Sequence, residues 1–565
     1  MPPAGSPPAS ATPRAAGTTY GRAAVPLNIS TPQAFGAAAP QPQQPPREFA
    51  QAQAPAAGHA DQPGGVSPGP VDRPGQTPAA AQPGARSRRT LVVSVVSAIV
   101  LVIVVAAGAL VVRPGPVDRW LAGDPTTAPT VAPTPEPTPT PVLAAVGTTG
   151  TAPTPEGVKA AIGPLVDAAV LGPRVNVSVV DTATGESLFA QNADTMTVPA
   201  STTKLLTAAT VLAARGPAYR LATRVVAGAK PGEVVLIGGG DPTLSVDAKG
   251  QFPGAARLDK LADQVEKAMG DRPITKVIVD TSLYQGPLTA KGWDGDVIGG
   301  GQVARIQPLM TNAGRIKPVH NEFGGDPRFI DPAAAAGRAF AKHLGLPSGA
   351  VSKGTAPAVA AASSAPPSAA AALAAGAELG KVESPPLVRV VDWMLEQSDN
   401  VIAEAMARQV ALAAGDEASF EGAAAAMIAK LGELELSTDE VRLSDGSGLS
   451  RQNKISPKAL TDVLTLAAGG KHPELSAMFG GLPVAGWSGT LRTRFVVPSA
   501  NQVGQGVVRA KTGSLTGVNA ISGELVTKDG RLLVFAIMAD ATGESGAARR
   551  ALDEIAAKLV TCGCN

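Results

Sequence analysis

The sequence predicts a mixed α/β (α+β) protein in which helices flank an antiparallel sheet. At the start of the folded region, "VNVSVVD", the turn "TATGE" and "SLFAQ" predict a hairpin, and "TTKLLTAATVLAARG" predicts a helix that ends at a glycine. The C-terminal region repeats this order with "VNAISGELVT", the turn "KDG", "RLLVFAIMAD" and the helix "GAARRALDEIAAKLV". We therefore expect both ends of the folded region to meet in one sheet, with a large inserted region between them.

Composition separates the folded region from the segments that precede it. Residues 1–89 are rich in Pro, Ala, Gln and Gly without an apolar period, which predicts a disordered tail. Residues 90–112 are apolar, and at about 1.5 Å per residue such a helix spans the roughly 30 Å core of a bilayer. Residues 113–156 include "DPTTAPTVAPTPEPTPTPV", which predicts an extended stalk.

The predicted transmembrane helix has an orientation signal. Arg86, Arg88 and Arg89 precede it, whereas the arginines that follow it are diluted by aspartates, so the positive-inside rule favours a cytoplasmic N-terminus. The tail is too long and the apolar stretch too extended for a cleaved signal peptide. We therefore expect a single-pass protein of the cell membrane, with the folded region outside the cytoplasm and an unknown partner for the tail.

Charge and metal-binding residues narrow the classes of function. A net charge of +2 over 565 residues, with no long basic run, argues against a nucleic-acid partner. The four histidines are scattered, so we predict no metal site and no cofactor. The only cysteines, Cys562 and Cys564, are either a disulfide or a pair of free thiols, and neither form makes them catalytic.

A serine and a lysine share one helical turn in "VPASTTKLLTAATVL". Ser201 is either an ordinary N-cap or a nucleophile. Lys204 stands where a capping box has Glu or Gln, and a cation is unfavourable near the positive end of the helix dipole. That field would lower the pKa of the lysine, so that a neutral amine could take the proton of the hydroxyl. The S-x-x-K pattern arises by chance, so it needs the rest of a site to carry weight.

A second segment offers a hydroxyl and an amide from one loop. In "VRVVDWMLEQSDNVIAEAMARQ", helical periods flank Ser398, Asp399 and Asn400, which predicts a helix, a short break and a second helix. Any of the three residues could simply cap the second helix. The functional interpretation uses Ser398 to pass protons and Asn400 to hold a substrate carbonyl.

A third segment, "GVVRAKTGSLTGVNAISGEL", places Lys511, Thr512 and Gly513 before an alternating strand. The simple interpretation is a solvated lysine and a bulge glycine. The functional one is that the cation and the hydroxyl bind a carboxylate, while the glycine lets a substrate backbone approach the strand. The backbone N–H of Ser514 would then pair with that of Ser201 as an oxyanion hole.

These three motifs, in this order, resemble the motif set of serine penicillin-binding proteins and β-lactamases. Within that group the chain is similar to the D-alanyl-D-alanine carboxypeptidase/endopeptidase family of the penicillin-binding protein 4 type, serine peptidase family S13. The segments "LIGGGDPTL", "LSDGSGLSR" and "LPVAGWSGTLRTRF", and the long insertion after Ser201, also look like that family. The resemblance covers most of residues 157–560.

The resemblance implies a fold and an activity. The fold would be a transpeptidase-like catalytic domain formed by residues 157–222 and 381–565, interrupted by one or more inserted domains over residues 223–380 that include an Ala-rich tract. The activity would be that of a membrane-anchored D-Ala-D-Ala carboxypeptidase, with or without endopeptidase activity. It would trim peptidoglycan stem peptides and be inhibited covalently by β-lactams. The alternatives are a non-catalytic penicillin-binding sensor or scaffold and a β-lactamase.

The resemblance also assigns roles to the motif residues. Ser201 would attack the carbonyl of the penultimate D-Ala, with either Lys204 or a relay through Ser398 as the base. The substrate-binding residues would be Asn400 for the substrate amide and Lys511 with Thr512 for the terminal carboxylate. Gly513 and Ser514 would line the strand beside the substrate.

Overall fold

The computed structural model describes residues 150–321, 324–358 and 373–563. The tail, the predicted membrane span, nearly all of the stalk and most of the Ala-rich tract lie outside these residues. No helix in the described part of the chain has the length and apolar character needed to cross a membrane, and the predicted span at residues 90–112 remains a prediction. Cys562 is disulfide-bonded, whereas Cys564 lies outside the described residues.

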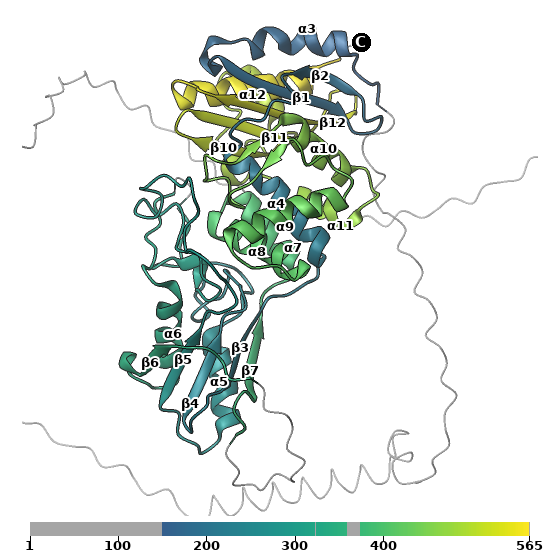
Figure 1. The fold of residues 1–565 in the computed structure, drawn as a ribbon. Helices are drawn as coiled ribbons and strands as arrows, with labels where there is room; N and C mark the ends of the chain where they lie inside the picture. The colour runs from purple at the N-terminus through teal and green to yellow at the C-terminus, as the bar shows by residue number, and fades with distance from the viewer. Residues whose placement is uncertain (1–149, 322–323, 359–372, 564–565) are drawn as a thin grey trace, which may run out of the picture. The chain divides into compact units, whose positions relative to one another are not determined.

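The main sheet is antiparallel and has the strand order β10-β11-β12-β1-β2 (Figure 1). Its strands are β1 (Arg174–Asp181), β2 (Ser187–Gln191), β10 (Arg509–Leu515), β11 (Val518–Val526) and β12 (Leu532–Asp540). Strand β1 pairs with β12 over its whole length, so the N-terminal and C-terminal regions meet as predicted. The two predicted hairpins, β1-β2 and β11-β12, are confirmed.

Helices cover both faces of this sheet. One face packs against α3 (Pro155–Val166) and α12 (Ser545–Thr561), with Val177 and Phe535 fully buried in that core. The other face packs against α10 (Pro457–Ala468), where the hydroxyl groups of Ser178 and Thr461 lie 2.8 Å apart. An alternating strand usually has one solvated face, but here helices cover both faces, so both are buried.

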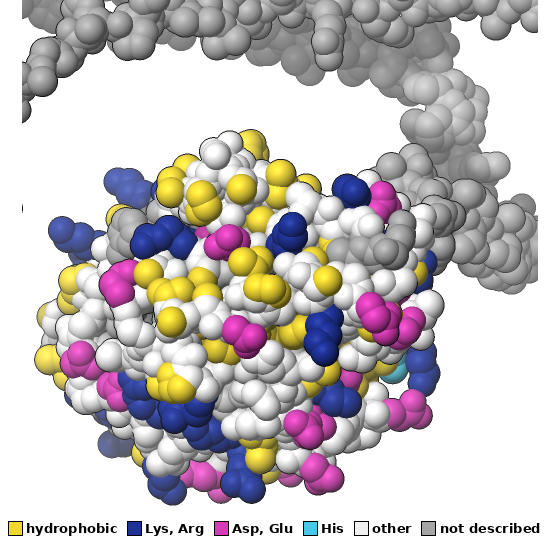
Figure 2. All heavy atoms as spheres, turned by 90° about the horizontal axis from the view of Figure 1, so that it is seen from above, with side chains coloured by type: hydrophobic (Ala, Val, Ile, Leu, Met, Phe, Trp, Pro, Cys, Tyr) yellow, Lys and Arg dark blue, Asp and Glu magenta, His cyan; other side chains and the backbone are white. Residues whose placement is uncertain are grey.

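The folded region begins slightly earlier than predicted. Helix α3 starts at Pro155, and the Thr154 hydroxyl caps it by accepting a hydrogen bond from the backbone N–H of Gly157 at 3.1 Å. A proline in the first turn and a threonine cap are ordinary helix-start signals, hidden here at the end of a Thr/Pro-rich run. From above, the side of the molecule with α3 shows charges of both signs interspersed with hydrophobic side chains (Figure 2).

A helical layer lies on the α10 side of the sheet. Besides α10 it contains α4 (Thr203–Arg215), α7 (Leu387–Glu396), α8 (Asn400–Ala414), α9 (Phe420–Glu433) and α11 (Pro473–Ser476). Helix α4 is the predicted helix that ends at Gly216, and it contacts α7, α8, α9 and α10. Its threonines donate hydrogen bonds to backbone carbonyls, so the polar side chains of this buried helix are satisfied.

A second, mixed sheet is inserted in the chain between α4 and α7. Its order is β6-β5-β4-β3-β7, with β4, β5 and β6 parallel and the other pairs antiparallel. Its strands and helices are β3 (Ala222–Ala227), β4 (Glu233–Ile237), α5 (Leu258–Met269), β5 (Lys276–Asp280), α6 (Pro332–His343), β6 (Val351–Lys353) and β7 (Glu378–Glu383). The apolar segments "EVVLI" and "KVIVD" form β4 and β5, and this region has its own hydrophobic core.

Short elements complete the described fold. A two-stranded pair, β8 (Val441–Arg442) and β9 (Lys454–Ile455), brackets the "LSDGSGLSR" segment. The 3₁₀ turns are η1 (Ala169–Leu171), η2 (Ala200–Thr202), η3 (Asn312–Gly314), η4 (Ser348–Ala350), η5 (Ala477–Gly481), η6 (Gly489–Leu491) and η7 (Ser499–Gly504).

The core beneath α3 and α12 allows a test of packing. Because Phe535 is fully buried there, Phe535→Ala should lower the free energy of unfolding by about 3–5 kcal/mol, measured by urea unfolding. Val497→Ala, at a side chain that is 64% exposed, is the control and should change it by less than about 0.5 kcal/mol. A loss below about 1 kcal/mol at Phe535 would contradict tight packing in this core.

Candidate active site

Ser201 lies in the short 3₁₀ turn η2, directly before α4. The N-cap positions of η2 and α4 are Pro199 and Thr202, and neither helix has a side-chain capping bond. The interpretation of Ser201 as an ordinary cap is therefore wrong. Ala200 adopts a left-handed conformation with φ of 48°, which is uncommon for a residue with a side chain and turns the chain sharply before the serine.

The Lys204 side chain is fully buried and points at this serine. Its Nζ lies 2.9 Å from Ser201 Oγ, 2.7 Å from Asn400 Oδ1 and 2.7 Å from the Ser447 carbonyl oxygen. The amide and carbonyl oxygens can only accept hydrogen bonds. A neutral amine has two N–H groups, and once these are donated to the two oxygens its lone pair is left facing the serine hydroxyl. The arrangement therefore suits Lys204 as a base.

Burial lowers the pKa of Lys204 to about 8, against the opposing influence of the negative charges of Asp445, Glu404 and Asp399. The sequence suggested the helix dipole as the cause of this shift, whereas the structure gives burial as the main one. An amine with such a pKa is partly neutral near physiological pH, so it can accept a proton without an unusual cost.

Ser398 lies in the break between α7 and α8, as predicted. Asp399 is the residue that caps α8, because its carboxylate accepts hydrogen bonds from the N–H groups of Val401 and Ile402. Ser398 itself is left-handed, with φ of 55°, and its Oγ accepts a hydrogen bond from Lys511 Nζ at 2.9 Å. The capping interpretation therefore holds for Asp399 and leaves the serine available for chemistry.

Asn400 and Lys511 are held by the protein itself. Asn400 Oδ1 accepts from Lys204, and its Nδ2 donates to the Gln302 carbonyl at 2.9 Å, so both ends of the amide are bonded. Lys511 is fully buried and also donates to the Thr512 carbonyl at 2.9 Å. Burial and the positive charge of Lys204 hold the pKa of Lys511 well below its usual range. In this structure Asn400 positions Lys204, and Lys511 positions Ser398.

Strand β10 forms the edge of the main sheet at the site. The N–H of Ala510 donates to the Pro483 carbonyl outside the sheet, and the alternation of an antiparallel strand gives Ser514 the same outward N–H direction. A Cβ on Gly513 would lie 2.6 Å from the Pro199 carbonyl oxygen. Gly513 is thus required because β10 approaches the turn that carries Ser201. The sequence had instead suggested that this glycine lets a substrate approach the strand.

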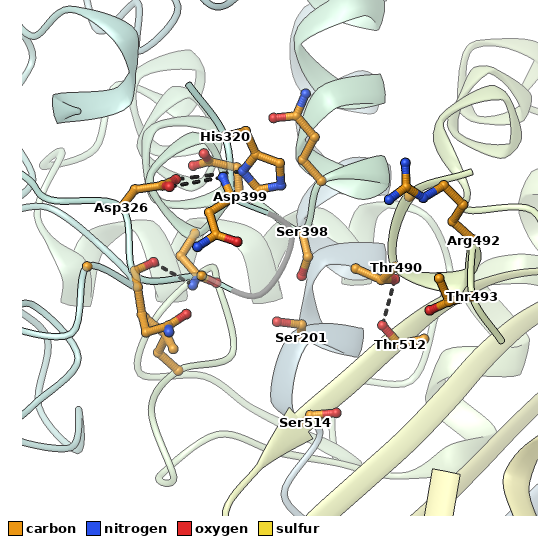
Figure 3. Close-up of a pocket in the computed structure, with 18 of the residues that line it drawn as sticks. Ser201, His320, Asp326, Ser398, Asp399, Thr490, Arg492, Thr493, Thr512 and Ser514 are labelled. Atoms are coloured by element: carbon orange, nitrogen blue, oxygen red, sulfur yellow. Dashed lines mark hydrogen bonds and ion pairs between the residues drawn. The ribbon is translucent and has the colours of Figure 1, made fainter. Parts of the chain in front are cut away.

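The site opens into a cleft of about 390 Å³ (Figure 3). Ser201, Ser398, Thr512 and Ser514 line it, whereas Lys204 and Lys511 lie behind its wall. The other lining residues are Gly301, Gln302, Arg315, His320, Asn321, Gly324, Asp326, Arg328, Gln397, Asp399, Asn400, Leu449, Gly489, Thr490, Arg492, Thr493, Arg494 and Arg549.

One wall of the cleft was missed by sequence reasoning. The Thr490 hydroxyl lies 2.8 Å from that of Thr512, and Arg492, Arg494 and Arg549 also line the cleft. Arg494 pairs with Asp553 at 2.7 Å. The segment "LPVAGWSGTLRTRF" contributed to the family resemblance, but nothing in it alone assigns a hydroxyl to the side of Thr512.

The "LSDGSGLSR" segment is the second part that sequence reasoning left without a role. It carries the Ser447 carbonyl to Lys204, and it packs against the turn before α4. Gly448 has φ of 84°, and a Cβ there would lie 1.8 Å from the Ala200 carbonyl oxygen. The side chain of Asp445 accepts from the N–H groups of Gly448 and Ser450, which closes this turn on itself.

The inserted region also contributes to the site. Arg315 is buried and pairs with Asp326 at 2.6 Å and with Asp399 at 2.8 Å. Burial alone would raise the pKa of Asp399, but the charges of Arg315 and Arg328 outweigh it and hold that pKa well below its usual range. The loop that carries Ser398 is therefore tied by an ion pair to a segment from the insertion.

Comparison with known proteins agrees with this geometry. The model of the D-Ala-D-Ala carboxypeptidase 3 (S13) family matches residues 163–364 and 331–559. The chain belongs to the S13 family. A carboxypeptidase of Mycobacterium tuberculosis is 39% identical to this S13 chain over 74% of its length and 87% of the relative. Carboxypeptidase DacB of Mycolicibacterium smegmatis is 38% identical over 73% of this chain and 86% of the relative. This S13 member is thus an enzyme, a D-Ala-D-Ala carboxypeptidase.

A solved structure supports the fold of this S13 member. Penicillin binding protein 4 of Haemophilus influenzae aligns with a TM-score of 0.55 at 21% identity, covering 71% of this chain and 98% of that chain. The same protein in complex with a β-lactam aligns with a TM-score of 0.51. The predicted penicillin-binding-protein-like fold, an antiparallel sheet flanked by helices, is therefore confirmed.

The burial of Lys204 gives a pH prediction. Only the neutral amine accepts a proton, so the acylation rate of Ser201 by a fluorescent penicillin should rise with pH and level off above a pH of about 8. The second-order rate constant, measured between about pH 6 and 9, tests this. A rate that is flat over this range would contradict Lys204 as the base.

The close approach at Gly448 gives a geometric prediction. Gly448→Ala should push the Ser447 carbonyl and the Ser201 turn apart, and misplacement of about 1 Å can cost roughly 100-fold in rate. Gly254→Ala is the matched control, because Gly254 has a similar φ of 74° but no atom near its added Cβ. Penicillin acylation rates of the two folded variants should therefore differ widely, and equal rates would count against the contact.

Proposed function

We propose that this chain is a membrane-anchored carboxypeptidase that removes the terminal D-Ala from peptidoglycan stem peptides through an acyl-enzyme on Ser201. The observation that carries the proposal is the placement of Lys204, whose Nζ lies 2.9 Å from Ser201 Oγ while its other two partners are pure acceptors. This serine faces a cleft that also contains the Ser398 hydroxyl and the edge of β10.

The proposed reaction begins at the serine. Ser201 Oγ forms a bond to the carbonyl carbon of the penultimate D-Ala, and its proton passes to Lys204 Nζ. The peptide C–N bond then breaks, and the departing amine needs one proton. In the proposed step the amine receives the proton that Lys204 took from Ser201, relayed through the Ser398 hydroxyl, so that Lys204 becomes neutral again. Lys511 orients that hydroxyl by a hydrogen bond. Water then hydrolyses the ester, which releases the shortened stem peptide and restores Ser201.

The cleft supplies groups for the charges of this reaction. The outward N–H of Ser514, together with that of Ser201, would stabilise the oxyanion of the tetrahedral intermediate. The paired hydroxyls of Thr490 and Thr512, with Arg492 on the same wall, would bind the terminal carboxylate of the substrate. This differs from the expectation that Lys511 holds the carboxylate directly, because its Nζ already serves Ser398.

The location and the inhibition complete the proposal. The predicted helix at residues 90–112 would hold the enzyme on the outer side of the membrane, where peptidoglycan is found. Penicillins would acylate Ser201 and leave slowly. This is supported by the β-lactam complex of the Haemophilus influenzae relative, which has the same fold. Cleavage of cross-links would use the same acyl-enzyme, since that step attacks the same kind of D-Ala carbonyl.

Release of D-Ala from a stem-peptide analogue tests the proposal. Ser201→Ala should lower the rate by more than about 1,000-fold and abolish penicillin labelling, because the proposed ester forms on the Ser201 hydroxyl. Ser476→Ala, at an exposed serine of α11, is the matched control and should keep full activity.

Two other outcomes would point to different functions. Labelling by penicillin without release of D-Ala would indicate a non-catalytic sensor. Rapid turnover of nitrocefin in place of a lasting adduct would indicate a β-lactamase. Loss of labelling in the wild type itself would overturn the assignment of Ser201.

A further inference from the structure

Helix α8 presents three buried polar side chains on one line. Asn400, Glu404 and Arg408 are spaced four residues apart, so they share a face of the helix. Asn400 contacts Lys204 directly, as described above. Arg408 donates to Glu404 at 3.4 Å and lies over the ring of Phe420 at 4.0 Å. The middle residue, Glu404, has no part in the mechanism described so far.

The Glu404 carboxylate binds the turn that serves Lys204. Its Oε1 accepts hydrogen bonds from the N–H of Gly446 at 3.1 Å and from the N–H of Ser447 at 2.9 Å. The carbonyl of the same Ser447 accepts from Lys204 Nζ at 2.7 Å. The Gly446 carbonyl in turn accepts from the Thr207 hydroxyl at 2.6 Å. One residue of the turn thus joins the carboxylate to the lysine.

We propose that Glu404 is a positioning residue for acylation, because its carboxylate sets the direction of the Ser447 carbonyl and thereby aims the lone pair of Lys204 at Ser201. The inference rests on the proposed role of Lys204 as the base. It requires Glu404 to be ionised, since a protonated carboxyl would place an O–H donor among the N–H donors of the turn and of Arg408. A glutamine at this position would likewise introduce donors where acceptors are needed.

The charges around Glu404 make this requirement visible in a pH profile. The groups that face it are Lys204 of α4, Asp445 of the turn and Arg408 of α8, with Tyr284 beyond Arg408. Burial and the charge of Asp445 raise the pKa of Glu404 to about 7, although Arg408 opposes the shift. The competent enzyme then has Glu404 ionised and Lys204 neutral.

The wild-type enzyme gives the first measurement. Two deprotonations must precede acylation, so the logarithm of the acylation rate against pH should have a slope of about 2 below pH 7 and about 1 between pH 7 and 8. This profile needs no variant, so it keeps the proposal testable even if a substitution at position 404 prevents folding. A slope of 1 throughout would overturn the role of Glu404 and leave Lys204 as the base.

The variant Glu404→Gln gives the second measurement. Its acylation by penicillin should fall by at least about 10-fold at pH 8, and its slope below pH 7 should drop to about 1. The KM for a stem-peptide analogue should change little, because Glu404 does not line the cleft. A rate within twofold of the wild type, with an unchanged slope, would overturn the proposal.

Asp181→Asn is the matched control for loss of a buried carboxylate. Asp181 is equally buried, accepts from the N–H groups of Ala183 and Thr184 and pairs with Arg531 at 2.6 Å, but it does not line the cleft. It should lose stability as Glu404→Gln does while keeping the wild-type rate and slope. Equal kinetic losses in both variants would show a merely structural effect. Failure of Ser201→Ala to abolish labelling would instead overturn the proposed function itself.

Discussion

The site depends on the burial of the Lys204 amine away from water. Lys204 lies in the core of the helical layer, where an ammonium loses its hydration. Nearby hydrogen-bond acceptors must compensate for that loss. Its three oxygen partners come from the turn η2 before α4, from α8 and from the 445–449 turn. A shift of any of these segments would therefore change the protonation of the amine. The three acidic groups around it keep the pKa from falling further. The packing of the helices therefore sets the protonation of Lys204.

The segments around this amine are themselves held by constraints that are local in sequence. Ala200 and Ser398 are left-handed and turn the chain just before α4 and α8. Ser201 follows the first of them, and Asn400 follows the second. Such conformations persist only where the surroundings fix them. For Ser398 the fixing group is Arg315 through Asp399, and for Ala200 it is the close contact with Gly448. The strained conformations near Ser201 and Ser398 are thus held by two segments that are far away in the chain.

Much of the fold could be predicted because its signals are local. Hairpin turns, alternating strands and a glycine-ended helix identified the main sheet and α4, and motif order identified Ser201, Lys204 and Ser398 as a group. The prediction was weaker where partners are distant: the Ser447 carbonyl, Thr490, Arg315 and Glu404 carry no local signal, because a backbone carbonyl or an ordinary helical glutamate looks the same in any sequence. The cause of the low pKa of Lys204 was also missed, since burial of a helix start depends on helices that arrive later in the chain.

The pairing of β1 with β12 has a consequence for the order of folding. The region from β3 to β7 is continuous in sequence and has its own core, so it can become structured as soon as it is synthesised. The main sheet cannot, because β1 and β2 are made early and must wait for β12, β11 and β10 at the other end of the chain. Closing such a distant pairing is slow. Ser201 therefore remains without β10 beside it until the last strands have been made, so that a chain truncated before β10 would carry the serine but only part of its cleft.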